Sequence, residues 1–353
     1  MPPWGRKEGP RRGEKVRRVE LRERYEEDLF LVKGTFARAA AIALAAALVA
    51  VPAYAPKYVV YIASLVAVNI IIAVGLNLLV GYTGQISLGH AGFVAIGAYA
   101  FGIVAARLPW GADLAHWGLP WLAGFVAAGI VAGAFGFLVG LPALRLTGPY
   151  LTIATLGFGI AVHQVLVNWE WLSGGRAGLF VPKLALAGWE LKERELYWIG
   201  LAAAAALTVI AYHLVRSYVG RAFVAIRDSD IAAEVMGVNL TTYKTLAFAV
   251  SAAYAGIGGA LFAMVGRYLE PSQFTLLDSI YYFSMIVVGG LGTIAGGVLG
   301  AGLLTVLPLE FSGFKQWQPV VYGAAIILVM ALEPRGVYGR WLKIKRWFKT
   351  WPF

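Results

Sequence analysis

Residues 81–98 read Gly-Tyr-Thr-Gly-Gln-Ile-Ser-Leu-Gly-His-Ala-Gly-Phe-Val-Ala-Ile-Gly-Ala, and apolar segments lie on both sides of them. Five glycines and several polar side chains interrupt the apolar pattern at this point. Irregular backbone at membrane depth is tolerated only where protein encloses it or where it lines a cavity. A break at Gly81 and Gly84 is therefore expected, and it constrains how the neighbouring helices are arranged.

A helix is expected to resume at about Ile86, which places Ser87 and His90 on one face at i and i+3. In one interpretation this is a discontinuous helix whose amino-terminal dipole end and polar side chains face a solute path. In the other, the polar side chains are hydrogen-bonding partners that hold packed helices together. Both interpretations concern the same signature residues, which are Asn77, Gly84, Gln85, Ser87, Gly89 and His90.

The composition indicates an integral membrane protein. Of 353 residues, 59% are hydrophobic and 14% are charged, whereas soluble domains carry about 25% charged residues. The absence of cysteine excludes disulfides and thiolate catalysis, and the four histidines show no metal-ligand spacing. No phosphate-binding loop or dinucleotide-binding turn occurs in the sequence, so no cofactor or metal is expected in this chain and it is not expected to be an enzyme.

The fold class is predicted to be all-α, a polytopic transmembrane helix bundle. Most apolar segments approach the roughly 20 residues that a bilayer core requires. Three of them are polar, short or glycine-rich, so the prediction is about ten spans, within a range of eight to ten. The predicted spans are 36–52, 58–80, 86–106, 119–141, 149–168, 196–215, 245–267, 276–291, 294–311 and 318–333.

The distribution of charge along the chain predicts which segments face the cytoplasm. Residues 1–38 hold eleven Lys/Arg against seven Asp/Glu, residues 334–353 hold six against none, and residues 169–195 hold four of each. Basic flanks mark the cytoplasmic side of a membrane protein, so the +11 net charge does not indicate nucleic acid. The predicted domains are a charged cytoplasmic tail over 1–38, a transmembrane domain over 39–333 and a basic cytoplasmic tail over 334–353. The loop 216–244 is then inside and 169–195 outside.

Small residues recur at four-residue spacing in several spans, as in Ala132, Gly136 and Gly140, and again in Gly256 and Ala260. Such seams allow helices to approach closely in lipid, where the hydrophobic effect does not drive association. The segments are therefore expected to form a compact bundle.

The inside loop 216–244 is predicted to carry a short amphipathic helix. Ser229 or Asp228 can cap it, Asp230 favours its first turn, and Gly237 suits the left-handed conformation that ends a helix. Its apolar face fits the groove of a partner protein, although the pattern alone slightly favours a helix that rests on lipid headgroups. The tryptophans of 169–195 likewise suit either a docking surface or an interfacial aromatic belt.

Several long motifs occur in order along the chain. They are Gly75-Leu-Asn-Leu-Leu-Val-Gly-Tyr-Thr-Gly-Gln-Ile-Ser-Leu-Gly-His-Ala-Gly-Phe93, Leu141-Pro-Ala-Leu-Arg-Leu-Thr-Gly-Pro-Tyr-Leu151, Thr155-Leu-Gly-Phe-Gly159, Asn168-Trp-x-x-Leu-Ser-Gly-Gly175, Gly220-Arg-Ala-x-x-Ala-Ile-Arg-Asp228 and Val288-Gly-Gly-Leu-Gly-Thr293. Over roughly residues 55–340 these motifs resemble the permease subunits of branched-chain amino acid ABC importers, the LivH/LivM family. The Gly-Pro-Tyr and Asn-Trp elements are more similar to the M-type subunit, whereas Arg176 stands where that type is expected to have a small residue or proline.

The resemblance implies a prokaryotic inner-membrane permease that imports branched-chain amino acids or related solutes by alternating access. It implies an H-type second permease, two ATPase subunits that carry ATP and magnesium, and an extracytoplasmic solute-binding protein; lipid is a partner and nucleic acid is not. The inside loop becomes a helix that couples to the ATPase. The residues then assigned to ATPase coupling are Arg221, Arg227, Asp228, Asp230, Ile231, Glu234 and Gly237.

The rival function is a secondary transporter of small polar solutes driven by an ion gradient. It predicts buried acidic residues near an ion site, and the acidic candidates Asp278 and Glu310 both lie near span ends. The sequence leaves open whether the solute is leucine, isoleucine, valine, an amide or urea.

Overall fold

The computed structural model describes residues 48, 50–107, 118–146, 148–183, 185–186, 189–310, 317–333 and 336–350. The chain divides into two compact units, Met1–Tyr54 and Ala55–Phe353. The predicted tail over 1–38 lies outside the described residues, as does most of the predicted span 36–52. The description that follows concerns the second unit.

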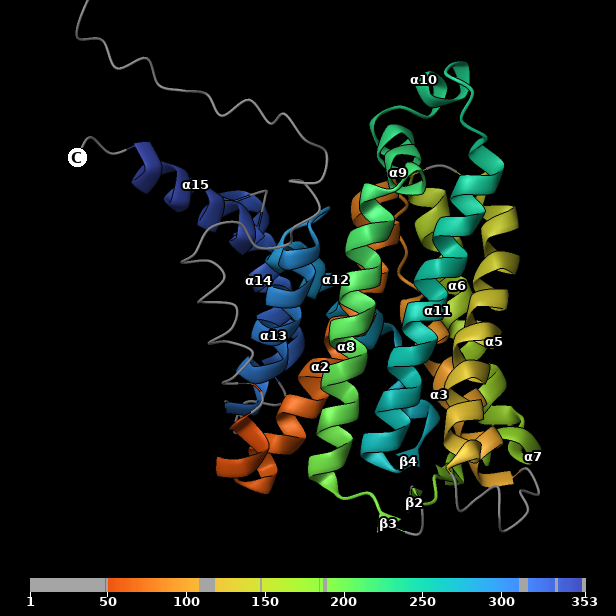
Figure 1. Ribbon diagram of the computed structural model, residues 1–353. Coiled ribbons are helices and arrows are strands. Elements are labelled where there is room, and N and C mark those ends of the chain that lie inside the picture. The colour runs from red at the N-terminus through yellow and green to blue at the C-terminus, as the bar shows by residue number, and fades with distance from the viewer. Residues whose placement is uncertain are drawn as a thin grey trace, which may run out of the picture. The chain divides into compact units, whose positions relative to one another are not determined.

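Helices form almost all of the regular structure in the described residues, and only two-residue strands accompany them (Figure 1). Prolines occupy first-turn positions in several helices, where a missing N–H costs nothing. The helices are α2 (Lys57–Asn77), the π-helix η2 (Leu78–Tyr82), α3 (His90–Arg107), α5 (Leu119–Ala143), α6 (Pro149–Asn168), α7 (Glu170–Ser173), η3 (Gly175–Ala177), α8 (Glu193–Arg216), α9 (Tyr218–Asp228), α10 (Asp230–Val235), α11 (Leu240–Gly266), η4 (Pro271–Gln273), α12 (Leu276–Gly289), α13 (Ile294–Glu310), α14 (Gln318–Leu332) and α15 (Gly336–Thr350).

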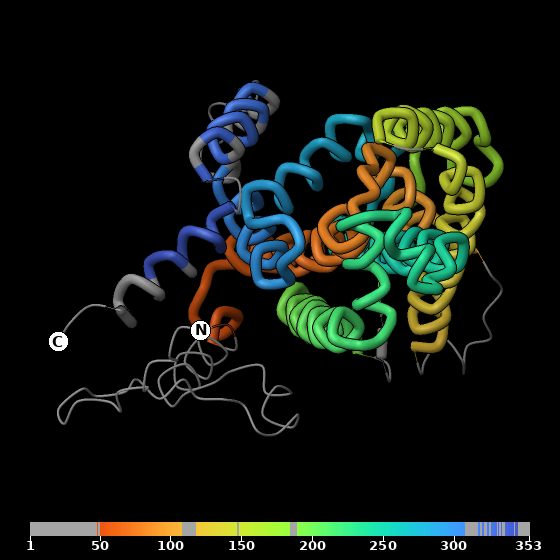
Figure 2. The backbone as a smooth tube through the Cα atoms, turned by 90° about the horizontal axis from the view of Figure 1, so that it is seen from above, coloured from red at the N-terminus to blue at the C-terminus, as the bar shows by residue number. Residues whose placement is uncertain are grey.

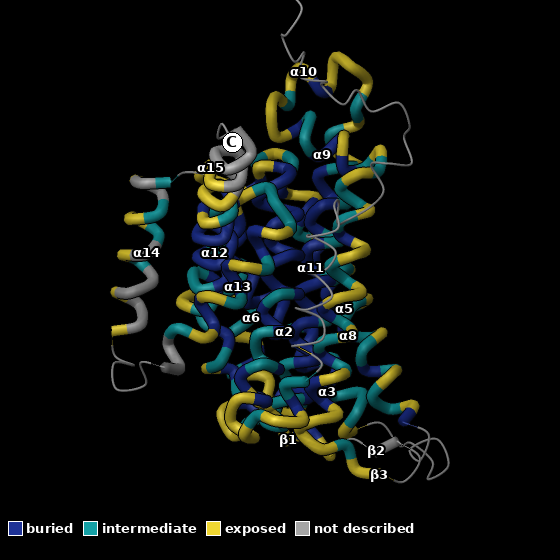
Figure 3. Tube along the Cα trace, turned by 60° about the vertical axis from the view of Figure 1, so that its left-hand side comes forward, coloured by how far each residue is buried: buried dark blue, intermediate teal, exposed yellow. Residues whose placement is uncertain are grey.

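The interior of the unit is built from α2, α3 and α11, which are mostly buried, whereas few residues of α5, α6 and α8 are buried (Figure 3). Helix α11 packs against α5, α3 and α2, and α13 packs against both α2 and α12. Seen along the helices, α6 lies at the edge of this arrangement (Figure 2). The predicted compact helix bundle is confirmed for the described residues.

Close contacts between small residues hold the interior helices together. A side chain at Gly97 would overlap the backbone of Gly256, and one at Gly256 would overlap the Ala128 carbonyl of α5. Along the same α5–α11 seam, Gly136 lies against Ala252. The four-residue spacing of small residues therefore marks true contact surfaces, as the sequence predicted.

The two ends of the unit differ in structure. Helices α9 and α10 lie at one end, and the strands and short helices lie at the other (Figure 1). There β1 (Leu179–Phe180) pairs with β4 (Tyr268–Leu269), and β2 (Ala185–Leu186) pairs with β3 (Trp189–Glu190); both pairs are antiparallel. These strands belong to the connections between helices.

Six of the described helices are long and apolar enough to cross a membrane, which is the pattern of a multi-pass membrane protein. They correspond to the predicted spans from 58–80 to 245–267. The predicted spans 276–291 and 294–311 are shorter as helices, with 14 residues in α12 and 17 in α13. The number of spans therefore stays a prediction.

Replacing Gly256 by alanine is expected to destabilise the protein by about 1–3 kcal/mol, because the new methyl group meets the Ala128 backbone and the Ala132 side chain in a packed interior. Thermal unfolding of the purified protein in detergent measures the loss. The matched control is Gly302→Ala, because no atom lies within 4 Å of a Cβ at Gly302. Equal unfolding temperatures for the two variants would contradict the close packing of α5 on α11.

Candidate functional site

The predicted break lies between η2 and α3. Residues 84–89 are not helical, and α3 begins at His90. The expected restart near Ile86 was therefore wrong by four residues, and Ser87 and His90 do not share a helix face. The reason is tertiary: the Leu88 N–H donates to Thr155 Oγ1 at 3.1 Å and the Ala91 N–H donates to Ser279 Oγ at 3.0 Å, which satisfies backbone groups without a helix.

Asn77 fastens the last turn of α2 to the loop between α12 and α13. Its Nδ2 donates to the Thr293 carbonyl at 2.7 Å, and its Oδ1 accepts the Gly292 N–H at 2.9 Å. The side chain is 1% exposed. Both ends of the amide are thus satisfied by one loop, and two glycine-rich motifs that lie over 200 residues apart in the sequence form one structure.

Arg227 connects the break to the predicted coupling loop. It lies in the last turn of α9, and its Nη1 donates to the Gly81 carbonyl at 3.0 Å. Its side chain also contacts Asp228 Oδ1 at 3.2–3.3 Å. A side chain at Gly84, where φ is +73°, would contact the Arg227 side chain. Hydrogen bonds from a charged group contribute about 1.5–3 kcal/mol, so this contact ties α9 firmly to the break.

Gln85, Ser87 and His90 are buried beside the break but make few hydrogen bonds. Gln85 Nε2 donates to Thr83 Oγ1 at 3.0 Å, within the break itself. Gln85 Oε1, Ser87 Oγ and both ring nitrogens of His90 have no hydrogen-bond partner among the described residues. Buried polar atoms without partners are uncommon in proteins. The side-chain hydrogen bonds that join this segment to α6 and α12 come from Thr155 and Ser279.

Gly89 has a packing role. A side chain there would overlap the Thr155 carbonyl of α6, so glycine allows the extended segment to lie directly on that helix. Sequence patterns assigned Thr155 no role beyond opening a motif and did not identify Ser279, because a single Ser or Thr on an apolar helix gives no local signal. The motif that ends at Thr293 was quoted, but the sequence assigned it no partner.

The predicted short helix is confirmed as α10. Ser229 caps it, with Oγ accepting the Ala232 N–H at 3.2 Å, and Gly237 follows it at φ +85°. Asp230 lies in its first turn and forms an ion pair of 2.5 Å with Lys244 of α11. The apolar side chains of this segment point away from the protein, with exposures of 78–83% for Ile231, Val235 and Met236.

The other residues predicted for coupling are spread around this loop. Glu234 is exposed. Arg221 is exposed too, and its Nη1 donates to the Arg216 carbonyl at 3.3 Å, at the end of α8. The structure thus separates Arg227, which reaches the interior, from Arg221, which stays at the surface.

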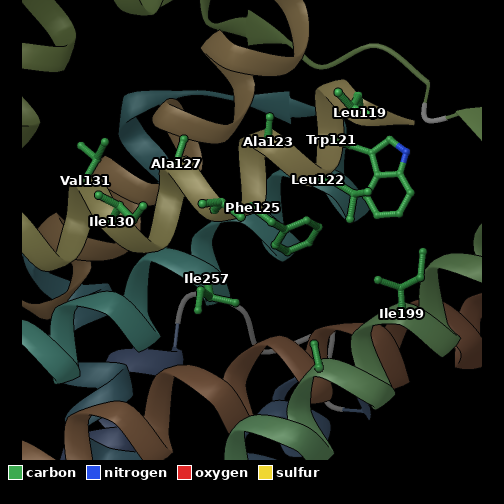
Figure 4. A pocket seen from close by; sticks show the side chains of 12 residues that line it. Leu119, Trp121, Leu122, Ala123, Phe125, Ala127, Ile130, Val131, Ile199 and Ile257 are labelled. Atoms are coloured by element: carbon green, nitrogen blue, oxygen red, sulfur yellow. The ribbon is translucent and has the colours of Figure 1, made fainter. Parts of the chain in front are cut away.

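A groove on the outer surface of the bundle has a different character (Figure 4). Its volume is about 890 Å³, and apolar side chains of α5, α8 and α11 line it, including Phe125, Ile199 and Ile257. Such a surface suits lipid acyl chains and offers nothing that would recognise a polar solute. At the end of the unit opposite α10, Lys183 lies 2.8 Å from Glu190, and its hydrogen bond and charge lower the pKa of that exposed carboxyl.

Comparison with known proteins gives the family. The family model described as "Branched-chain amino acid transport system / permease component" matches residues 58–330. The chain belongs to this permease family. No solved structure matches it.

Curated relatives in the permease family point to its M-type members. The chain is 33% identical over 247 residues to the high-affinity branched-chain amino acid transport system permease protein LivM of Salmonella typhimurium. The alignment covers 63% of this chain and 58% of that protein. The chain is also 28% identical over 258 residues to LivH of Escherichia coli, covering 68% and 81%, and 28% identical over 230 residues to BraD of Pseudomonas aeruginosa, covering 62% and 75%. The alignment thus spans a little under three-fifths of the LivM length.

Replacing Asn77 by aspartate is expected to destabilise the protein by about 1–3 kcal/mol, because a carboxylate cannot donate to the Thr293 carbonyl. Thermal unfolding in detergent checks this. Asn239→Asp is the matched control: Asn239 Oδ1 only accepts, from the Thr242 N–H at the start of α11, and aspartate caps a helix equally well. If both variants unfold like the unaltered protein, Asn77 does not hold the loop.

Proposed function

We propose that this chain is the transmembrane permease subunit of an ATP-driven importer for branched-chain amino acids or closely related small solutes. The observation that carries the proposal is the contact between Arg227 and the Gly81 carbonyl. It joins α9, in the predicted cytoplasmic loop, to the helix break and its buried polar side chains. Family membership over residues 58–330 supports the same function.

The exposed face of α10 is the proposed docking surface for an ATPase subunit. A short amphipathic helix that presents Ile231, Val235 and Met236 to its surroundings fits the groove of a partner protein. Its polar side is held to the permease by the Asp230–Lys244 ion pair. ATP and magnesium would then be bound by the partner, and this chain contributes motion rather than covalent chemistry.

Arg227 is the proposed link between that docking surface and the solute path. It lies two residues before Ser229, which caps α10, and it donates to the Gly81 carbonyl in η2. Movement of α10 therefore pulls on Gly81, and through Asn77 on the loop before α13. Opening and closing of the path by a separate ATPase pair, which is alternating access, needs such a connection.

The unpartnered atoms of Gln85, Ser87 and His90 are the proposed polar lining of the path. In the described arrangement they are enclosed, which corresponds to a closed path. When the helices separate, these atoms become available to water or solute. This assignment favours the path interpretation of the signature residues over the hydrogen-bonding one.

The proposed assembly includes an H-type permease, two ATPase subunits and an extracytoplasmic solute-binding protein in a prokaryotic inner membrane. The exposed face of α6 is a candidate for contact with the second permease, because Ala154, Gly157 and Ala161 form a seam of exposed small residues there. Large apolar side chains such as Ile153 and Ile160 lie beside this seam. The ten-span topology with both termini inside belongs to the same proposal.

The ion-gradient alternative gains no support from the acidic residues. Asp278 caps its own helix, because its Oδ2 accepts the Thr275 N–H at 2.8 Å and the Thr275 hydroxyl at 2.7 Å. That carboxylate is occupied by a structural role. The side chain of Glu310 lies outside the described residues.

The test is uptake of labelled leucine by proteoliposomes that contain the full importer. We expect uptake that requires both ATP and the ATPase pair, and uptake that persists without the ATPase would contradict the proposal. Val235→Asp is expected to abolish ATPase binding without unfolding the protein, because that side chain is 82% exposed. Trp189→Asp, equally exposed at the opposite end, is the matched control and should retain ATPase binding.

Arg227→Gln is expected to leave ATPase binding intact and to slow ATP-driven uptake about tenfold or more, because glutamine lacks the charged donor to Gly81. Arg221→Gln, which removes only a surface contact with the Arg216 carbonyl, should transport normally. The ratio of solute transported to ATP hydrolysed distinguishes the two variants. Normal coupling in Arg227→Gln would remove the proposed link.

A further inference from the structure

A polar pocket lies at the end of the unit opposite α10, between α6, η3 and η4. Its volume is about 330 Å³, at the lower end of the range of small-molecule sites. Gln164, Asn168, Arg176, Glu270 and Ser272 supply polar groups, and Val167 and Pro271 supply apolar surface. Unlike the apolar groove of Figure 4, this pocket therefore offers polar and charged groups that can bind a polar solute.

One positive and one negative side chain, Arg176 and Glu270, line the pocket without forming an ion pair with each other. Among the described residues, neither Arg176 nor Glu270 forms an ion pair. The Glu270 carboxylate accepts only a backbone N–H from Gln273, in a capping box. The Arg176 guanidinium makes no hydrogen bond to any described residue. An arginine and a carboxylate that line one small pocket without meeting are complementary to a ligand that bears both charges.

The pocket is held in shape by its own neighbours. His163 Nδ1 lies 3.0 Å from the Pro271 carbonyl oxygen, and because a carbonyl only accepts, Nδ1 carries the proton in this contact. Leu179 of β1 pairs with Leu269 of β4, so the segment that follows Arg176 is held beside the segment that precedes Glu270. The Gln164 carboxamide and the Ser272 hydroxyl make no hydrogen bond to described residues, so both are free to donate to a ligand.

We propose that this pocket binds a small zwitterionic α-amino acid, with Glu270 receiving the ammonium group, Arg176 the carboxylate, and Val167 and Pro271 the aliphatic side chain. The inference rests on the proposed import function and narrows its solute, because urea and neutral amides carry neither charge. It also gives a role to Arg176, which the sequence marks as a departure from the resembled family. The pocket adjoins the exposed face of α6 at Gln164.

The absence of cysteine from the chain allows a direct binding test. A single cysteine is introduced as Ser272→Cys in the complete importer in nanodiscs, where both faces are accessible, and its rate of reaction with a soluble thiol reagent is measured. Leucine in the millimolar range is expected to protect the thiol, whereas urea and leucinamide, which lacks the carboxylate, are not. Gln164→Cys is the second reporter if Ser272→Cys does not assemble, and Lys183→Cys on the exposed hairpin is the unprotected control.

Adding Arg176→Gln or Glu270→Gln to the reporter is expected to raise the leucine concentration for half-protection about tenfold or more, since each removes a charged partner of the ligand. Equal protection by leucine and leucinamide, or protection unaffected by both charge variants, overturns the inference. So does protection by the solute-binding protein alone, which would make the pocket a protein docking surface. Protection requires no transport, so leucine protection without ATP-driven uptake supports the pocket while overturning the importer.

Discussion

The structure depends on one constraint, which is that an interrupted helix in lipid must have its backbone groups satisfied by protein. Between η2 and α3 the chain leaves the helical path for six residues, 84–89. Side chains on distant helices accept backbone N–H groups here: Thr155 of α6 accepts from Leu88, and Ser279 of α12 accepts from Ala91 at the start of α3. Because each bond joins different parts of the sequence, the break can exist only in the assembled bundle.

The break also holds the buried polar side chains to which the proposed function is assigned. Glycines allow the backbone of η2 to approach the loop after α12, since a side chain at Gly81 would overlap both Asn77 and Gly292. The Gly81 carbonyl then remains available to Arg227. Packing, loop attachment and the proposed coupling therefore share a few atoms, which brings motifs that lie far apart in the sequence into contact.

Local patterns predicted much of this architecture. Apolar runs located the long helices, small-residue spacing located the α5–α11 seam, and the Ser229, Asp230 and Gly237 pattern located α10 with its cap and its end. The restart of α3 was misplaced, because single polar residues on α6 and α12 replace the helical bonds there and no local pattern names such partners. For the same reason the sequence grouped Arg227 with Arg221, although only one of them reaches the break.

The Arg227 contact also has a genetic consequence. Its acceptor is a backbone carbonyl, which every amino acid at position 81 would supply, whereas its donor is a particular guanidinium. No substitution at the acceptor residue can delete that oxygen, although a larger residue could displace it. The identity of residue 227 therefore determines whether the donor of this bond is present, whereas the backbone supplies the acceptor whatever residue stands at position 81. The exposed side chains of α10 can accordingly be replaced without altering the attachment behind them.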